Sequence, residues 1–304
     1  MKQDVYTKIT NDIIEMLEQG KVAWRKQWKY AGEYRHSNFK TKKPYRGVNA
    51  FITYIKAVTA GFESPYWVTY KQATELGGVV KKGSKSTSIV FYTKSWFDKN
   101  GKWHKQPKGV SDAEMIEQGY KKYLSPRYYN VFNLDQVEGI EWNLKKSPDY
   151  NKNDIIEHAE RIINDMPNKP EYRICETPRA CYSPVGDWIE MPLIEQFESS
   201  DAYYSTFFHE MIHSTGHGSR LDREGVTGEA YFGDDTYSKE ELVAEIGACF
   251  LSAETGILQQ EIENSVAYLQ HWIKQLKEDS KLIWKASQDA QKAVDYILSS
   301  TDEA

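Results

Sequence analysis

The sequence predicts an α+β protein of two domains, a small basic one followed by a helix-rich one. Strand-like and helical stretches mix in the first part, whereas helical periodicity dominates the second. The charge divides similarly: residues 1–110 hold 21 Lys and Arg against 8 Asp and Glu, and residues 151–304 hold 13 against 29. We therefore expect a domain over residues 1–139, a linker over 140–152 and a second domain over 153–304.

The expected first domain combines two helices with short strands. Apolar residues at helical spacing predict helices over residues 4–19 and 49–60. Alternation predicts a strand over residues 88–93, and Asp98-Lys99-Asn100-Gly101 is typical of a hairpin turn. A last strand over residues 127–133 completes this domain.

The first 110 residues are also aromatic, with 18 of the 41 Phe, Trp and Tyr residues of the chain. Cations that follow a phosphate backbone and rings that stack on bases are what single-stranded nucleic acid binding requires. The alternative is that the rings form a core, as Phe51 and Tyr54 on one helical stripe suggest. The candidate nucleic-acid contacts are Trp24, Arg25, Lys26, Lys42, Lys43, Tyr45, Arg46, Lys71, Lys81 and Lys82.

The expected second domain places a small sheet before its main helices. A helix is predicted over residues 153–165, with the segment 188–191 as the edge strand that would lie along a bound peptide. The remaining expected elements are strands over 172–175 and 180–183 and long helices over 258–277 and 280–298.

The motif HExxH occurs at residues 209–213, within this helical part. His209 and His213 are four residues apart, so both imidazoles lie on one helical face and can bind one metal ion. Glu210 then lies where it can take a proton from a water molecule on that metal. The motif therefore indicates a zinc peptidase with Glu210 as general base, and other divalent transition metals remain an option.

A later helix offers carboxylates for the third ligand position. Ser238 followed by Glu241 resembles a capping box, which predicts a helix that begins there. We assign Glu241 as the third ligand and Glu245 as a carboxylate that holds one of the histidines. The reverse assignment is the alternative, and Glu240 is a weaker third choice.

Three protein ligands would leave a fourth position for water, as in catalytic zinc sites. A glutamate from a later helix is typical of gluzincins. The metzincin pattern HExxHxxGxxH fails because residue 219 is a serine, and we interpret His217 as a loop residue. We expect Gly216 to end the helix in the left-handed conformation.

Composition favours a cytoplasmic protein. No apolar run approaches the roughly 20 residues that span a bilayer, so we expect no membrane association. The three scattered cysteines, Cys175, Cys181 and Cys249, suit a reducing compartment.

The chain as a whole resembles the ArdC-type antirestriction proteins of conjugative plasmids and other mobile elements. The resemblance depends on Trp24-Arg25-Lys26, on Tyr45-Arg46-Gly47-Val48-Asn49, on the segments 67–73, 77–83 and 131–136, on the HExxH segment and on residues 240–251. It implies a domain that binds single-stranded DNA, and by extension duplex DNA, joined to a zincin-like domain with the HExxH histidines and a downstream glutamate as ligands. Host restriction proteins or other DNA-bound proteins are then candidate substrates.

Two functions remain open at this point. In the first, DNA binding brings a zinc peptidase to proteins on or near the incoming strand. In the second, the basic domain masks DNA and the metal site is structural or regulatory. The presence of Glu210 favours the enzyme, because a site under no catalytic demand could carry another residue there.

Overall fold

The computed structural model describes residues 4–18, 35–143, 154–175, 179–228, 235–257 and 265–299. It is an α+β structure, as the sequence predicts, with helices and three separate sheets. Among the described residues, no helix is long and apolar enough to cross a membrane.

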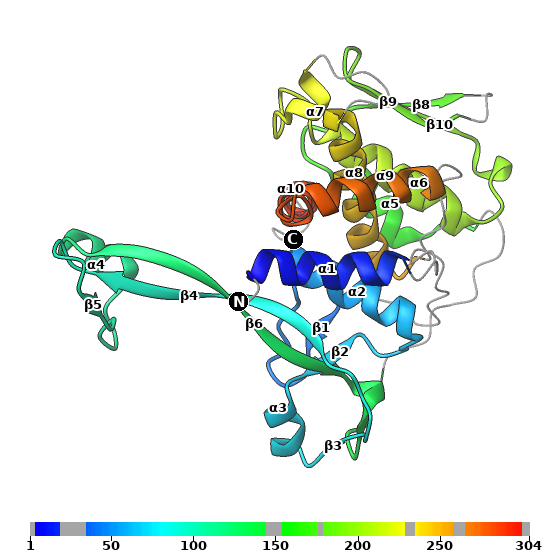
Figure 1. The fold of residues 1–304 in the computed structure, drawn as a ribbon. Coiled ribbons are helices and arrows are strands. Elements are labelled where there is room, and N and C mark those ends of the chain that lie inside the picture. The colour runs from blue at the N-terminus through cyan, green and yellow to red at the C-terminus, as the bar shows by residue number, and fades with distance from the viewer. Residues whose placement is uncertain are drawn as a thin grey trace.

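The first half contains four helices and seven strands within the described residues (Figure 1). The helices are α1 (Val5–Glu18), α2 (Val48–Ala60), α3 (Tyr70–Glu75) and α4 (Asp112–Glu117). The strands are β1 (Ser37–Asn38), β2 (Tyr66–Val68), β3 (Val79–Val80), β4 (Thr87–Phe97), β5 (Trp103–His104), β6 (Lys121–Asn133) and β7 (Val137–Glu138).

Five of these strands form one sheet in the order β1-β2-β6-β4-β5. The strands β1 and β2 are parallel, and the other pairs are antiparallel. On the root of this sheet, Ile89 and Val131 are buried with Ile9 and Ile13 of α1 and Phe51 of α2 in one hydrophobic core. The predicted helices over 4–19 and 49–60 are thus present, and each buries an apolar face.

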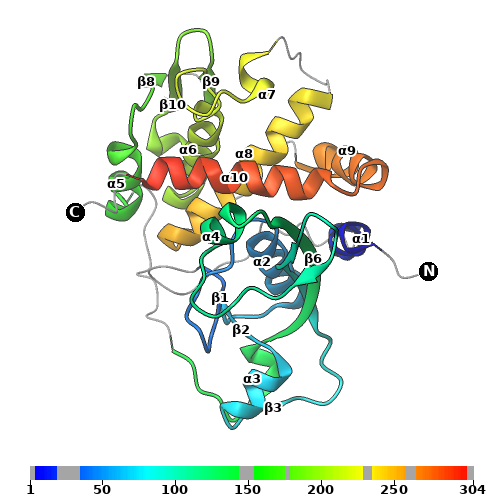
Figure 2. The ribbon, with the colours of Figure 1, turned by 90° about the vertical axis from the view of Figure 1, so that its left-hand side faces the viewer.

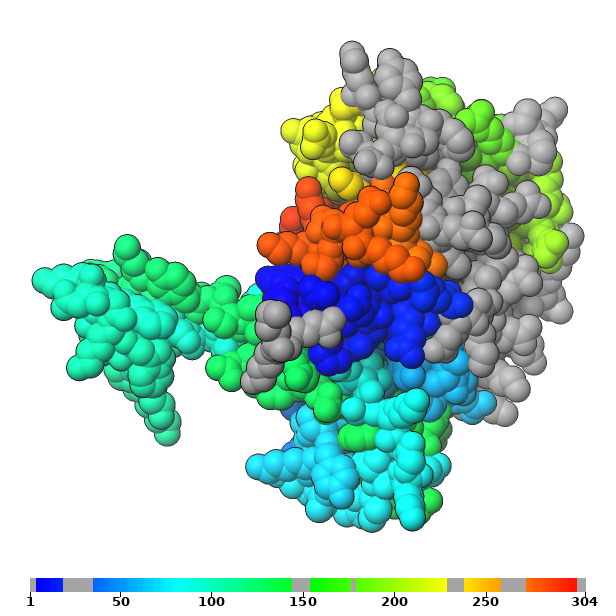
Figure 3. Space-filling view, in the orientation of Figure 1, coloured from blue at the N-terminus to red at the C-terminus, as the bar shows by residue number. Residues whose placement is uncertain are grey.

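The pair β4 and β6 is longer than the sequence predicted. It extends through eleven paired positions from Thr87↔Val131 to Phe97↔Lys121. In Figures 1 and 3 this hairpin leaves the body of the molecule, with α4 and β5 at its far end. The predicted strand covered residues 127–133, whereas β6 begins at Lys121.

Where the structure describes it, the second half combines a small sheet with five larger helices and one short one. The strands are β8 (Glu171–Cys175), β9 (Cys181–Ser183) and β10 (Trp188–Pro192). The helices are α5 (Glu157–Asp165), α6 (Ser200–Ser214), the short α7 (Glu224–Thr227), α8 (Asp235–Thr255), α9 (Ser265–Glu278) and α10 (Leu282–Leu298).

The small sheet has the order β8-β10-β9, so β10 is the central strand. The prediction that residues 188–191 form the edge strand is therefore wrong. The strand β10 pairs with β8 on one side and β9 on the other, which uses both of its edges. The edge that lies against α6 is β9.

One continuous hydrophobic core joins the two halves. It contains Ile13 of α1, Ile52 of α2, Ile212 of α6, Ile246 of α8 and Ile283 of α10. Figure 2 shows α10 running across the molecule between the first-half helices and α6 and α8.

Polar contacts cross the same boundary. Arg35 pairs with Glu254 at 2.6 Å, Arg46 pairs with Asp295, and Lys277 pairs with Glu18 at 2.6 Å. Two of these pairs join a cation of the basic half to an acid of the acidic half, and the third has the opposite polarity. Part of the proposed linker, residues 144–152, lies outside the described residues, and its limits stay a prediction.

Candidate functional site

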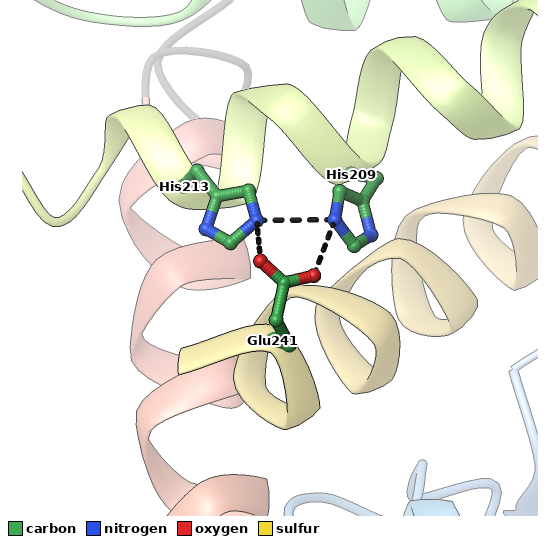
Figure 4. A group of neighbouring side chains, drawn as sticks. All are labelled: His209, His213 and Glu241. Atoms are coloured by element: carbon green, nitrogen blue, oxygen red, sulfur yellow. Dashed lines mark hydrogen bonds and ion pairs between the residues drawn. The ribbon is translucent and has the colours of Figure 1, made fainter. Parts of the chain in front are cut away.

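The helix α6 carries the HExxH motif. Its N-terminus is capped by Ser199, whose side chain accepts a hydrogen bond from the Ala202 amide at 3.1 Å. Tyr204, Phe208 and Met211 are fully buried and fix the helix in the core. The opposite face turns His209 and His213 toward α8 (Figure 4).

The helix α8 supplies the carboxylates that face this pair. It begins at Asp235, one turn before the predicted start, so Ser238 is a buried interior residue and not a cap. The predicted capping box is therefore wrong, because the chain ahead of Ser238 is already helical. Further along α8, a Cβ on Gly247 would lie 2.6 Å from Cδ1 of Ile212, so only glycine allows α6 and α8 this close.

Three side chains converge where the two helices meet. The Nε2 atoms of His209 and His213 are 3.0 Å apart. The Glu241 carboxylate oxygens lie 3.5 Å from Nε2 of His209 and 3.4 Å from Nε2 of His213 (Figure 4). His209, His213 and Glu241 thus form the cluster that could hold a metal ion within the described part of the chain.

Each histidine has a second carboxylate behind it. Nδ1 of His213 lies 3.3 Å from Glu240, and Nδ1 of His209 lies 3.7 Å from Glu245. A carboxylate on Nδ1 favours the tautomer with the proton on that nitrogen. Both Nε2 lone pairs then point at each other and at Glu241, which leaves three electron donors facing one small space.

Arg223 fixes one of these outer carboxylates. Its guanidinium donates to both oxygens of Glu240, at 2.6 and 3.0 Å, and also to the carbonyl of Ile212 at 2.7 Å and to Oγ1 of Thr215 at 2.6 Å. Glu240 is therefore held in place between Arg223 and His213. Sequence reasoning missed Arg223, although an arginine shortly after HExxH was visible as a possible partner for a buried carboxylate.

The pKa directions follow from this arrangement. Burial would raise the pKa of Glu241, but the two histidines hold it far below its usual range. Burial would lower the pKa of His213, but Glu241 and Glu240 raise it well above its usual value. Burial raises the pKa of Glu245, and the nearby His209 only partly offsets that effect.

Glu210 lies beside the cluster and contacts the sheet. Its Oε2 accepts a hydrogen bond from the Tyr182 amide of β9 at 2.8 Å. The strand β9 is fixed in turn by Arg220, which donates to the Tyr182 hydroxyl at 3.2 Å, to Asp187, and to the Ser214 carbonyl at 2.7 Å. The edge strand and the end of α6 are thus held together at the candidate general base.

The turn after α6 differs from the expectation in one respect. Gly216 does not adopt the left-handed conformation that we predicted for it. A Cβ at this position would lie 2.5 Å from Cγ2 of Val226, so close packing against α7 requires the glycine. His217 lies in this turn and contacts Oγ of Ser219 at 2.8 Å, away from the three converging side chains.

The candidate nucleic-acid contacts are dispersed over the first half. Trp24, Arg25 and Lys26 lie outside the described residues. Lys42 lies 3.7 Å above the Phe39 ring, Lys43 is exposed nearby, and Lys71 lies 3.7 Å from Glu75.

Two candidates in this region are engaged in the fold itself. Tyr45 is only 8% exposed, so its ring offers no face to a base, and burial raises its pKa to about 12. Arg46 pairs with Asp295 of α10.

The last two candidates are adjacent lysines that differ in their contacts. Lys81 donates to the Asp135 carbonyl at 2.8 Å, while Lys82 is exposed.

Comparisons with known families agree with this division of the chain. Residues 3–132 match the family described as the N-terminal domain of anti-restriction factor ArdC. Residues 157–289 match the zincin-like metallopeptidase family.

Two curated relatives align with nearly all of the chain. DNA primase TraC of Escherichia coli is 35% identical over 98% of this chain, but the chain spans only 27% of the primase. The uncharacterized protein y4eC of Sinorhizobium fredii is 27% identical, and the alignment covers 99% of this chain and 94% of y4eC.

Two solved structures are similar along their whole length. The metal-free crystal structure of antirestriction protein ArdC from plasmid R388 is 34% identical, has a TM-score of 0.74 and is covered over 99% of both chains. The Mn(II)-bound structure of the same protein has a TM-score of 0.70 over 98% of both chains. The chain therefore belongs to the ArdC family of antirestriction proteins.

Proposed function

We propose that this ArdC-type protein carries a zinc-dependent peptidase site of gluzincin type and binds single-stranded DNA through its basic half. The observation that carries the first part is the convergence of His209, His213 and Glu241 from two packed helices. Lone pairs at such short separations repel unless a proton or a metal ion lies between them.

The spacing of the three donors supports a metal ion in particular. Ligand atoms about 2.0–2.1 Å from a tetrahedral zinc ion are about 3.3 Å from one another. The three separations here, 3.0, 3.4 and 3.5 Å, bracket that value. Zinc suits two imidazoles and a carboxylate. The manganese in the R388 relative shows that another divalent metal is accepted by a protein of this family.

His209, His213 and Glu241 would hold the metal, and three protein ligands leave room for water or substrate. Bound there, zinc supplies Lewis acidity for a peptide carbonyl and lowers the pKa of a water molecule. Glu240 would keep the imidazole of His213 in the tautomer that binds metal through Nε2, and Glu245 lies 3.7 Å from Nδ1 of His209, on the side that favours the same tautomer.

Glu210 would act as the general base that takes the proton of the attacking water and later passes it to the leaving amine. The Tyr182 amide holds one carboxylate oxygen of Glu210 at 2.8 Å, which leaves the other oxygen for the water. The strand β9 that donates this bond is the sheet edge closest to α6, and a peptide could lie along it.

Single-stranded DNA binding is supported by the charge of the first half and by the family of its first 132 residues. The same protein then places a peptidase site within reach of proteins on that DNA. Restriction proteins and other DNA-bound proteins are the substrate class that an antirestriction role favours.

The test replaces the proposed base without touching the ligands. Glu210→Gln should keep one zinc per chain and unchanged affinity for single-stranded DNA. It should lower the cleavage rate of an unfolded protein substrate by about 10²–10⁴-fold, the usual contribution of a general base. The matched control is Glu195→Gln, which changes an exposed glutamate in the segment before α6. This variant should cleave like the wild type.

Protection against restriction in cells separates the two functions. Loss of protection with Glu210→Gln would tie antirestriction to proteolysis. Full protection by that variant would instead support a non-catalytic protein that masks DNA and uses the metal for structure or regulation.

A further inference from the structure

The hairpin of β4 and β6 is an isolated projection, which we call the arm and define as residues 91–127. At about 3.3 Å per residue, the eleven paired positions of β4 extend roughly 36 Å. Asn49 of α2 fixes the root, because its side-chain amide bonds the Val90 amide and carbonyl, both at 2.7 Å. Tyr92 still hydrogen-bonds Tyr6 of α1, and beyond that contact the arm stands clear of the body in Figure 3.

The strand register sorts the side chains of the arm into two faces. Directly paired residues share a face, and alternate residues along a strand return to it. The pairs Phe91↔Arg127, Phe97↔Lys121 and Phe97↔Trp103 therefore mark one face. Five rings lie on it, and we call them the aromatic track: Phe91, Phe97, Trp103 and Tyr123 on the arm and Tyr129 at its root.

Four of these rings are exposed, and four of the five form two contacting pairs. Phe91, Trp103, Tyr123 and Tyr129 are between 44% and 56% exposed. The Phe91 and Tyr129 ring centroids are 5.4 Å apart, and those of Phe97 and Tyr123 are 5.3 Å apart. Six residues of strand, roughly 20 Å, separate the two pairs. Exposed rings at this density are rare on a surface that only faces water.

The charges on the two faces differ. Lys121 and Arg127 share the face of the aromatic track, are exposed, and form no ion pair within the described ranges of the chain. On the opposite face, Lys94 and Lys122 both bind Asp112, at 2.9 and 2.8 Å. The cations beside the rings are thus available to an anionic partner, whereas Lys94 and Lys122 on the opposite face already share a carboxylate.

We infer that the aromatic track of the arm binds single-stranded DNA, an assignment that rests on the proposed function and names its surface. Rings provide stacking platforms for unpaired bases, and neighbouring cations neutralise phosphates. The paired positions of this face carry no carboxylate, since Thr93, Ser95 and Ser125 fill the interval between the rings. None of the contacts predicted from sequence lies on the arm.

The experiment compares the two faces of the same arm. The probe is a fluorescein-labelled oligothymidine of about 20 nucleotides, longer than the roughly 4–16 that one binding module covers. Phe91→Ala combined with Tyr123→Ala should weaken binding by about a hundredfold, since each stacked base contributes about tenfold. Tyr92→Ala combined with Leu124→Ala removes side chains of similar exposure, 45% and 53%, from the opposite face and should bind like the wild type.

Further readouts keep the assignment distinct from the general proposal. Tyr123→Phe and Tyr129→Phe preserve the rings and should bind normally, while affinity for a duplex of the same length should change little in the Ala variant. If Phe91→Ala/Tyr123→Ala keeps the affinity of the wild type, the assignment of DNA binding to the aromatic track is wrong. DNA would then bind to another surface of the protein. Equal losses from both faces would overturn the assignment too, and a wild-type protein that does not bind the oligonucleotide would remove the proposed function itself.

Discussion

The metal centre and the arm treat charge in opposite ways. At the centre, Glu240, Glu241 and Glu245 are nearly or fully buried, and each faces a histidine within 4 Å. On the arm, Lys121 and Arg127 are exposed and no described acidic residue pairs with them. Burial makes an unpaired charge costly, so the centre has fixed partners, whereas exposed charges can exchange partners with solvent ions.

This difference says where each kind of function can reside. A metal site needs ligand atoms at set positions, and the core supplies them through two helices in close contact. A surface for a flexible polyanion needs reach and weakly engaged groups, which a projecting hairpin provides. The following predictions, from the largest expected effect to the smallest, test that distinction.

Removing the third ligand should have the largest effect. Glu241→Gln keeps the size of the side chain but loses the charge, and zinc affinity should fall by more than about a hundredfold, beyond the usual effect of an outer carboxylate. Competition with a chromogenic zinc chelator measures this affinity. A similar loss from Glu245→Gln together with a small one from Glu241→Gln would reverse our assignment of the two glutamates.

The pair of Arg223 and Glu240 behind His213 should have a smaller but measurable effect on zinc affinity. Arg223→Met frees Glu240 from its two guanidinium bonds, and we expect zinc affinity to fall by about 10–100-fold. Glu240→Gln should produce a loss of the same size, and the double variant should add little, because the two residues act through one contact. Additive losses would mean that Arg223 acts through its bonds to Ile212 and Thr215 instead.

Adding a methyl group at the contact between α6 and α8 should destabilise the protein. Gly247→Ala normally favours a helix, but here the new Cβ would lie 2.6 Å from Ile212. We expect about 1–3 kcal/mol less stability from overpacking, measured by urea unfolding of the metal-free protein. Ile212→Val in the same chain should restore part of it, and a neutral Gly247→Ala would show that the helices can move apart freely.

The smallest effect concerns the loop cations. Replacing both Lys42 and Lys43 with Gln should make the plot of log affinity for single-stranded DNA against log salt shallower by up to about 1.4, roughly 0.7 per lost phosphate contact. Arg46→Gln should leave that slope unchanged, because Arg46 already pairs with Asp295. A slope that responds to Arg46 but not to the lysines would place DNA against α10.

The sequence predicted the parts of this molecule that are locally encoded. Helical spacing located α1, α2 and α6, and the HExxH motif with a later glutamate named the three side chains that converge. The start of α8 was misplaced because Ser238 and Glu241 imitate a cap inside a longer helix.

Features that depend on contacts between distant parts of the chain could not be predicted from local sequence patterns. The central position of β10 depends on which strands pair with it, and Arg223 contacts Glu240 across 17 residues of sequence. The arm was missed because both of its faces meet solvent, which blurs apolar alternation.

The most direct test is a crystal of the zinc-loaded protein, with an anomalous map collected at the zinc edge. We predict one peak per chain, bonded to Nε2 of His209, Nε2 of His213 and a carboxylate oxygen of Glu241. An empty map, or a peak on other side chains while Glu241 turns away from the imidazoles, would contradict the account of this centre.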